Sequence, residues 1–396
     1  MRIGLAGPIS LEILREYLPT SGAEISTYSF PYIGELARAY LQAGHEVDVF
    51  TSSVVVDKPV VIEGRKLRVH IGRRRESARQ RGLDFFKLER ADLAGLMAGS
   101  NPDVIHAHWL YEFAKSALDV QPDSLITAHD SPLSIIRHYK HPYWWLRGAL
   151  GLSSLAKAKN LTAVSPSLVS EISKILVKSP NVTVIPNGIE IPSLTSGTSA
   201  QPRRNFTFAS IANGFDSRKN TAAAIKAYSI VRKSVPSAKL MMFGVGHGPG
   251  EDAYLWAAEN GLATGVEFIG ATPHEKLLSS LVQGVDVLVH TSRWEACSMA
   301  ILEAQARGVP VVGGERSGGV PYTLGGGRWG RLVNIDSPDD IATAMKDLVN
   351  DDVMYQRLSR DAACETGREF DFRSVVQRYL LLLETIADTR GAHDGR

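Results

Sequence analysis

The stretch TSRWEACSMAILEAQARGVPVVGG, from Thr291 to Gly314, contains two glutamates that could bind one ligand together. Glu295 precedes an apolar helical pattern and Glu303 lies inside it, with seven residues between them. Carboxylates accept hydrogen bonds from hydroxyl groups, and the first N–H groups of a helix attract anions. We expect the helix to begin near Cys297–Ser298, with Glu303 about two turns further on. The free backbone N–H groups would then belong to Ala296, Cys297, Ser298 and Met299.

Two adjacent cations, Arg218 and Lys219, precede another helical pattern in the segment NGFDSRKN. Cations at a helix start interact unfavourably with the helix dipole unless a bound anion neutralises them, so these two residues suggest a phosphorylated ligand. One carboxylate for each of two diols, with a diphosphate between them on amides and cations, is the arrangement that a nucleotide sugar needs. The alternative is that the glutamates and the cations are ordinary solvated residues. The glycines of GVGHGPG fit a phosphate loop only loosely and fit a structural turn as well.

Short β-branched runs alternate with longer helical patterns along the chain, which predicts parallel sheets covered by helices. Ligands of such sheets bind beyond the carboxyl ends of the strands, where both the cations and Glu295 are expected. The segment PSLTSGTSAQPRRN, from Pro192 to Asn205, is typical of a linker. We therefore predict an α/β protein with two doubly wound, Rossmann-like domains. The expected parts are a first domain over 1–192, a linker over 193–205, a second domain over 206–370, and a terminal helix within 371–396 that packs back toward the first domain.

The composition describes an ordinary globular protein, with 396 residues, 44% hydrophobic residues and a formal net charge of +2. That charge gives no indication of nucleic acid binding. Cys297 and Cys364 are the only cysteines, which suits a reducing compartment. The sequence has no apolar run of the roughly 20 residues that span a bilayer, and MRIGLAG at its start is predicted to be a strand. We expect a cytoplasmic protein, which could also contact the inner face of the membrane peripherally.

The chain resembles the family-four retaining glycosyltransferases with the GT-B fold. The resemblance spans nearly the whole sequence, and the order and spacing of its motifs are more specific than any motif alone. The matching segments are AGHEVDVFT, PDVIHAHW, TAHD, AVSPSLV, VIPNGIE, RKN, the glutamate pair with its glycine pair, SGGVPY and GRLVN. The resemblance implies that the two domains face each other across a cleft, with the donor in the second domain and the acceptor in the first.

The resemblance also implies roles for individual residues. Glu295 corresponds to a glutamate at the donor sugar hydroxyls, and Glu303 to one at the ribose. Arg218 and Lys219 fall at the donor diphosphate, and His129 of TAHD matches a histidine that approaches the transferred sugar. The catalytic residues are then His129 and Glu295, and the amides of Ala296, Cys297, Ser298 and Met299 surround the donor. By analogy no metal or other cofactor is expected, since cations of the protein and helix dipoles neutralise the charge of the diphosphate.

Three positions depart from the family pattern. Gly214 stands where the family often has an arginine, so Arg218 could substitute for it. Ser26, Thr27 and Tyr28 occupy the place of a glycine pair in the first domain. Tyr322 replaces a glutamate that often follows the second glycine pair. These departures concern the donor loops, so neither the nucleotide base nor the sugar follows from the motifs.

Two further groups of residues have alternative interpretations. His106 and His108 lie on one face of a predicted strand end, which could suggest a metal, but no third ligand has matching spacing. The run RRRESARQR, Arg73 to Arg81, is a solvated loop in the simplest interpretation. Together with the segment YWWLRG, Tyr143 to Gly148, it would also suit an anionic acceptor or an anionic membrane surface.

We therefore predict a retaining glycosyltransferase that uses a nucleotide-diphosphate sugar, active in the synthesis of a glycan, exopolysaccharide or glycoconjugate. The acceptor hydroxyl would belong to a sugar, a lipid-linked compound or a small molecule. The alternatives are a nucleotide-sugar epimerase on the same fold and a non-catalytic nucleotide-sugar-binding protein. A dinucleotide-dependent dehydrogenase is disfavoured, because no acidic ribose-binding residue follows a clear GxGxxG motif.

Overall fold

The computed structural model describes the chain except residues 20–24, 29, 140, 177–181, 193–205 and 395–396. The predicted linker, residues 193–205, therefore lies outside the described residues. The chain forms two compact units. Unit 1 comprises Met1–Pro186 and Ser374–Arg396, and unit 2 comprises Asn187–Arg373.

Unit 1 is built on an eight-stranded sheet with the strand order β3-β4-β2-β1-β5-β6-β7-β8. Neighbouring strands are parallel except β3 and β4, which form an antiparallel edge that the sequence analysis did not anticipate. The apolar residues of β1, such as Ile3 and Leu5, are fully buried, as expected for a central parallel strand. The strands are β1 (Arg2–Ala6), β2 (Glu46–Ser53), β3 (Val60–Glu63), β4 (Leu67–Arg73), β5 (Val104–His108), β6 (Leu125–Ala128), β7 (Asn160–Ala163) and β8 (Val182–Val184).

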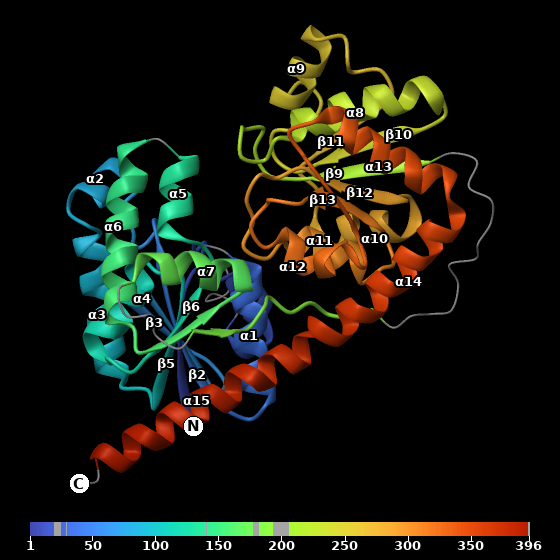
Figure 1. Ribbon diagram of the computed structural model, residues 1–396. Helices are drawn as coiled ribbons and strands as arrows, with labels where there is room; N and C mark the ends of the chain where they lie inside the picture. The colour runs from blue at the N-terminus through green and yellow to red at the C-terminus, as the bar shows by residue number, and fades with distance from the viewer. Residues whose placement is uncertain (20–24, 29, 140, 177–181, 193–205, 395–396) are drawn as a thin grey trace. The chain divides into compact units, whose positions relative to one another are not determined.

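Helices cover this sheet, with α1 on one side and α3 and α4 on the other (Figure 1). Helix α1 ends at Gln42, and Gly44 follows with a φ of +94°, the left-handed conformation in which a glycine commonly ends a helix. The helices are η1 (Leu11–Tyr17), α1 (Pro31–Gln42), α2 (Ala78–Leu83), α3 (Lys87–Ser100), α4 (Glu112–Val120), α5 (Pro132–His138), α6 (Pro142–Lys157) and α7 (Pro166–Ile175).

Unit 2 is built on a six-stranded parallel sheet with the order β11-β10-β9-β12-β13-β14. Each face of the sheet has its own core. Tyr228 and Met345 belong to one apolar cluster, whereas Leu281 and Ile301 belong to the other. The strands are β9 (Thr207–Ile211), β10 (Lys239–Phe243), β11 (Val266–Gly270), β12 (Val287–His290), β13 (Val311–Gly314) and β14 (Arg331–Val333).

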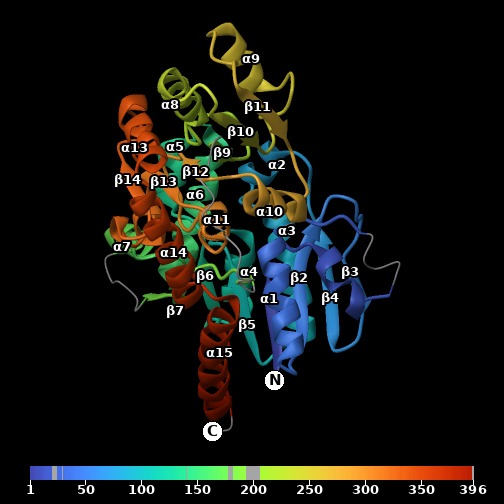
Figure 2. The same ribbon diagram turned by 90° about the vertical axis from the view of Figure 1, so that its right-hand side faces the viewer.

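The helices α8 and α13 of unit 2 lie side by side on one face of the sheet, while α10 and α11 lie on the other (Figure 1 and Figure 2). The last helix, α15 (Phe372–Asp394), begins in unit 2 and belongs to unit 1 from Ser374 onward. Both sheets have the doubly wound order that the alternating pattern predicted. The helices of unit 2 are α8 (Thr221–Ser234), α9 (Asp252–Glu259), α10 (His274–Gln283), α11 (Met299–Gln305), α12 (Val320–Thr323), η2 (Gly325–Gly327), α13 (Pro338–Asn350) and α14 (Asp352–Glu369).

Candidate functional site

The strands β9 and β12 bring the predicted cations and the first glutamate of unit 2 together. These two strands pair in parallel, so the loops that follow them begin at the same edge of the sheet. Arg218 and Lys219 lie in the loop between β9 and α8, and Glu295 lies in the loop between β12 and α11. The N–H of Arg293 donates to the carbonyl oxygen of Arg218 at 2.7 Å, which joins the two loops.

Glu295 is held through one of its two carboxylate oxygens. Its Oε1 accepts hydrogen bonds from Lys219 Nζ at 2.6 Å and from Ser292 Oγ at 2.8 Å. Nη1 of Arg218 lies 3.6 Å from the same oxygen. Within the described ranges no group bonds to Oε2, and the side chain is 17% exposed. One oxygen is therefore fixed while the other is available to a ligand.

The local charges keep Glu295 ionised. Burial by itself would raise the pKa of its carboxyl group, but the charge of Lys219 outweighs that effect, with a smaller contribution from Arg218. The pKa of Glu295 falls to about 2 as a result. The neighbouring His290 is the opposite case, because burial lowers its pKa to about 4 and leaves the ring neutral near pH 7.

Turn geometry places the two cations. Oδ1 of Asp216 accepts the backbone N–H groups of both Arg218 and Lys219 at 2.8 Å, an Asx-type turn that fixes the direction of the loop. Earlier in the same loop, Gly214 has a φ of +91°, a conformation that side chains with a Cβ rarely adopt. An arginine at this position, as the family often has, would therefore strain the loop.

Helix α11 begins at Met299, one residue after Ser298, so the predicted start near Cys297–Ser298 is slightly early. Ser298 is the N-cap residue, but its side chain makes no capping hydrogen bond. No acceptor from the part of the chain that the structure describes bonds to the backbone N–H groups of residues 296–299. Cys297 is buried, and burial raises the pKa of its thiol to about 12, so this cysteine stays a neutral thiol.

Glu303 lies on α11 and forms a separate contact with His274 at the start of α10. Nε2 of His274 is 2.8 Å from Oε1 of Glu303, and this hydrogen bond raises the pKa of the histidine. As with Glu295, none of the described residues bonds to Oε2. The sequence analysis did not single out His274, although ATPHEK follows β11 at the expected carboxyl edge.

The second glycine pair of unit 2 closes against the backbone of Glu295. The N–H of Gly319 donates to the carbonyl oxygen of Glu295 at 2.6 Å. Gly318 has a φ of +63°, and a Cβ there would lie 2.6 Å from the same oxygen. A glycine is therefore required for this close approach. Tyr322, which replaces a common glutamate, packs against Phe370 with ring centroids 5.5 Å apart.

The predicted catalytic histidine, His129, follows β6 in unit 1. Its Nε2 lies 2.8 Å from Nδ1 of His108, so one of the two rings donates a hydrogen to the other. The ring also contacts Phe30 and Tyr32, and burial lowers the pKa of His129 to about 3. His129 is therefore neutral near pH 7, and a ring of such low basicity is suited to hydrogen bonding.

His106, which the sequence analysis considered together with His108, is held by contacts within the core of unit 1. Its ring bonds to the hydroxyl groups of Tyr40 at 3.1 Å and Thr127 at 2.7 Å, and Tyr379 of α15 packs against it. Among the described residues, no group of three or more His, Cys, Asp or Glu side chains is arranged to hold a metal ion. In the same residues no helix is both long and apolar enough to cross a bilayer.

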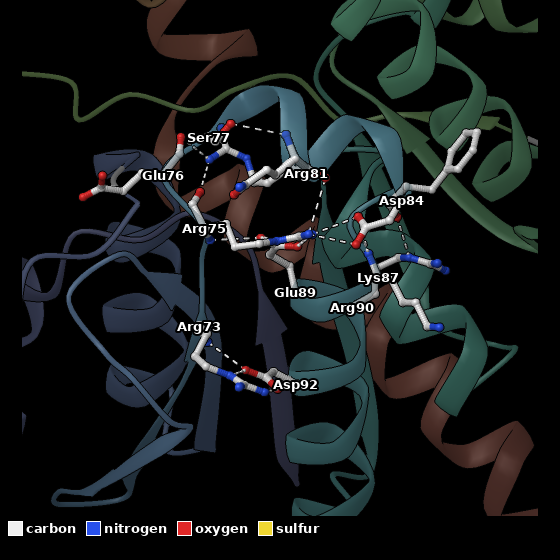
Figure 3. A network of polar contacts seen from close by, with 12 residues as sticks. Arg73, Arg75, Glu76, Ser77, Arg81, Asp84, Lys87, Glu89, Arg90 and Asp92 are labelled. Atoms are coloured by element: carbon white, nitrogen blue, oxygen red, sulfur yellow. Dashed lines mark hydrogen bonds and ion pairs between the residues drawn. The ribbon is translucent and has the colours of Figure 1, made fainter.

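The basic run Arg73 to Arg81 differs from a solvated loop, because carboxylates of the following segment hold two of its arginines (Figure 3). Arg73 forms two side-chain hydrogen bonds with Asp92, both of 2.8 Å. Arg75 lies between Asp84 and Glu89, at 2.8 Å and 2.6 Å. These two arginines therefore stabilise the fold and are not available to an anionic surface.

Comparison with known proteins identifies the family. Residues 31–191 match the family model described as Glycosyltransferase Family 4, and residues 200–364 match the one described as Glycosyl transferases group 1. The chain is 30% identical to a D-inositol 3-phosphate glycosyltransferase of Corynebacterium jeikeium (strain K411), over 43% of this chain and 44% of that protein. It is 24% identical to a phosphatidyl-myo-inositol mannosyltransferase of Mycolicibacterium smegmatis, over 98% of this chain and 94% of that protein.

The solved structures agree with this assignment at the level of the fold. A sucrose-phosphate synthase from Thermosynechococcus elongatus superposes with a TM-score of 0.77 at 17% sequence identity. The superposition covers 98% of this chain and 100% of that one. The chain therefore belongs to the family-four glycosyltransferases and has the GT-B fold.

Proposed function

We propose that this protein transfers a sugar from a nucleotide-diphosphate sugar to an acceptor hydroxyl, with retention of configuration at the anomeric carbon. One observation carries the proposal: Glu295 and Glu303 each have one oxygen fixed by a neighbouring side chain and the other unbonded. A carboxylate with one oxygen fixed and the other unbonded can accept hydrogen bonds from a diol. Membership of the family supports the assignment of the sugar to Glu295 and of the ribose to Glu303.

The donor diphosphate would lie between these carboxylates. Arg218 and Lys219 supply positive charge, and the unbonded amides of residues 296–299 supply hydrogen-bond donors. This set offers two cations and several hydrogen-bond donors to a diphosphate, which supports a reaction without a metal or other cofactor. The same groups would stabilise the negative charge that develops when the nucleoside diphosphate leaves.

The transfer step would depend mainly on positioning. His129 is neutral, so we assign it hydrogen bonding to the transferred sugar and no transfer of a proton. An oxygen of the leaving diphosphate would accept the proton of the acceptor hydroxyl on the same face of the sugar, and the new glycosidic bond would form as the old one breaks. In this mechanism unit 1 binds the acceptor, unit 2 binds the donor, and the protein provides no covalent nucleophile.

A panel of UDP-, GDP- and ADP-sugars, screened by thermal shift, tests the donor site. A true donor at 100 times its dissociation constant should add about 2.7 kcal/mol to the free energy of unfolding. Lys219→Ala should abolish the shift, while Arg316→Ala, which removes an exposed cation in the same unit, should preserve it. An equal shift in both variants, or no shift with any donor, would refute the donor assignment.

The stereochemical claim needs a separate measurement. Once a donor is known, proton NMR of the transfer product with a panel of sugar, lipid-linked and small-molecule acceptors should show the anomeric configuration of the donor retained. Inversion would exclude the proposed mechanism. Conversion of the donor sugar without any acceptor would identify an epimerase instead.

A further inference from the structure

Three arginines of unit 1 lie close together beside α6. Arg74 follows β4, Arg81 belongs to α2, and Arg147 belongs to α6. The two helices are neighbours, because a Cβ on Gly82 of α2 would lie 3.3 Å from the ring of Tyr143 on α6 (Figure 1). Nη1 of Arg147 donates to the hydroxyl group of the same Tyr143 at 3.1 Å. We call Arg74, Arg81 and Arg147 the arginine cluster.

The arginine cluster lacks matching negative charge. Within the described ranges no carboxylate lies within 4.0 Å of Arg74 or Arg81, whereas the sequence neighbours Arg73 and Arg75 are both paired. Arg147 has Glu112 at 3.7 Å. A second carboxyl group that interacts with Arg147 belongs to Asp130, which accepts a hydrogen bond from Tyr111 and whose pKa is raised to about 6 by burial. Even with Asp130 ionised, three guanidinium groups face two carboxylates.

Burial makes this imbalance costly. Arg81 and Arg147 are only 7% and 5% exposed, and Nε of each has no hydrogen-bond partner among the described residues. Arg81 is held by the carbonyl oxygens of Arg75 and Glu76, which carry no net charge. Buried charges without a counter-ion destabilise a fold, so a site of this kind favours a bound anion.

Arg74 is the accessible member of the cluster. It is half-buried, and its guanidinium group lies 3.6 Å above the centre of the Tyr28 ring. Burial lowers the pKa of Arg74, and the charges of Arg81 and Arg147 act in the same direction, while Tyr28 and Glu112 act against it. A stacked, planar guanidinium group presents its N–H edge to a ligand in a fixed orientation.

A continuous set of aromatic rings connects Arg74 with His129. Tyr28 contacts Trp109 with ring centroids 5.5 Å apart, and Trp109 stacks on Phe30 at 5.9 Å. Phe30 in turn meets the His129 ring edge-on at 6.0 Å. A ligand held by Arg74 would therefore lie on the same edge of the sheet as the proposed catalytic histidine.

We propose that the arginine cluster binds a phosphate group carried by the acceptor, so that the acceptor is a phosphorylated hydroxyl compound. A phosphate carries up to two negative charges and pairs with guanidinium groups through two parallel hydrogen bonds, which matches the excess charge and the planar groups. A flat membrane surface fits less well, because such surfaces attract clusters of exposed cations, and two of these three arginines are buried. The assignment of the phosphate to an acceptor rests on the proposed function, whereas the phosphate site itself does not.

Calorimetric titration of the full chain with inorganic phosphate, at constant ionic strength and without nucleotide, tests the site. Arg74→Gln should weaken phosphate binding at least tenfold, and Arg74→Lys should restore part of it. Arg79→Gln is the matched control, because it removes an exposed arginine of the same run. The arginine cluster is not a phosphate site if Arg74→Gln binds as the wild type does, or if Arg79→Gln weakens binding equally.

A Lys219→Ala background separates this site from the donor site. Phosphate binding that survives Lys219→Ala and disappears with Arg74→Gln belongs to unit 1, whether or not the donor assignment holds. Binding lost with Lys219→Ala alone would overturn the proposal. Thermal unfolding and circular dichroism of each variant show whether the fold is intact.

Vesicles distinguish the source of the phosphate. Co-sedimentation with phosphatidylcholine vesicles containing 20 mol% phosphatidylinositol, lost with Arg74→Gln and reduced by added inorganic phosphate, would identify a lipid headgroup. Phosphate binding without such co-sedimentation would identify a free phosphorylated acceptor. Co-sedimentation that Arg74→Gln leaves unchanged, together with unchanged phosphate binding, would contradict both.

Discussion

The two charged clusters of this protein differ in whether their cations have carboxylate partners. In unit 2, Lys219 and Arg218 already share the carboxylate of Glu295, so both cations have a carboxylate partner before a ligand arrives. In unit 1, Arg74 and Arg81 have no carboxylate within 4.0 Å in the described part of the chain. At the proposed donor site a diphosphate would have to compete with Glu295 for its cations, whereas an anion that binds Arg74 and Arg81 would displace no carboxylate.

This difference predicts the largest effect for Lys219→Ala. The substitution removes a positive charge from the leaving diphosphate and also leaves Glu295 with a weaker partner. Loss of one such stabilising group typically costs a factor of about 100 to 1,000 in turnover. Release of nucleoside diphosphate, followed in a coupled assay, measures the rate, and Glu295→Ala should cause a comparable loss. If both variants turn over like the wild type with the fold intact, the unit 2 site is misassigned.

The pH dependence of stability tests the charge pairing of Glu295 in unit 2. The pKa of Glu295 is lowered from its ordinary value of 4.5 to about 2, so its ionised form stabilises the folded state above pH 4.5. That contribution, of at most about 3 kcal/mol, should disappear as the pH falls from about 5 toward 2. Urea unfolding of wild type and Glu295→Gln should show a difference in free energy that is constant from pH 8 to 5 and shrinks below. A difference that grows on acidification would contradict this sign.

The contact between His274 and Glu303 should have a smaller effect. His274→Ala leaves the Glu303 carboxylate in place but removes the ring that fixes its Oε1. We expect about a fivefold to tenfold rise in KM for the donor, with turnover nearly unchanged, because binding of the ribose contributes equally before and during the transfer. Steady-state kinetics with Ser279→Ala on the same helix as the control measure this. A fall in turnover without a change in KM would place His274 in the chemical step.

His129 should show the smallest change. Its pKa is lowered to about 3 by burial, so the ring should stay neutral from pH 8 to 5. Nitrogen-15 NMR of the labelled histidines should show no protonation of His129 in this range, while an exposed histidine such as His141 serves as the internal reference. Titration of His129 near pH 6.5 would show that the ring is solvated and would reopen a role in proton transfer.

The sequence was informative where a pattern repeats and less so where side chains meet across loops. The alternation of runs predicted both parallel sheets, and the positions after the strands predicted the loops that carry Glu295 and Lys219. The direct bond between these two residues was not predicted, because it depends on the distance between two loops that are 76 positions apart in the chain. The antiparallel strand β3 was missed because a short edge strand has little alternation to detect.

The basic run shows the same limit. The arginines and the glutamate of RRRESARQR show that the run is charged, but not where each side chain points. The partners Asp84, Glu89 and Asp92 lie on the segment that follows. The packing of α3 beside β4 brings Glu89 to Arg75 and Asp92 to Arg73, and leaves Arg74 without a carboxylate. The difference between adjacent arginines is therefore a tertiary property.

Unit 1 is assembled from the two ends of the chain, since Tyr379 of α15 packs against His106 at the centre of its sheet. A ribosome completes the eight strands of this sheet long before it has made α15. During translation, unit 1 therefore lacks the contact between Tyr379 and His106 until the segment of unit 2 has been made. The folding of unit 1 can therefore be completed only after the whole of unit 2 has been synthesised.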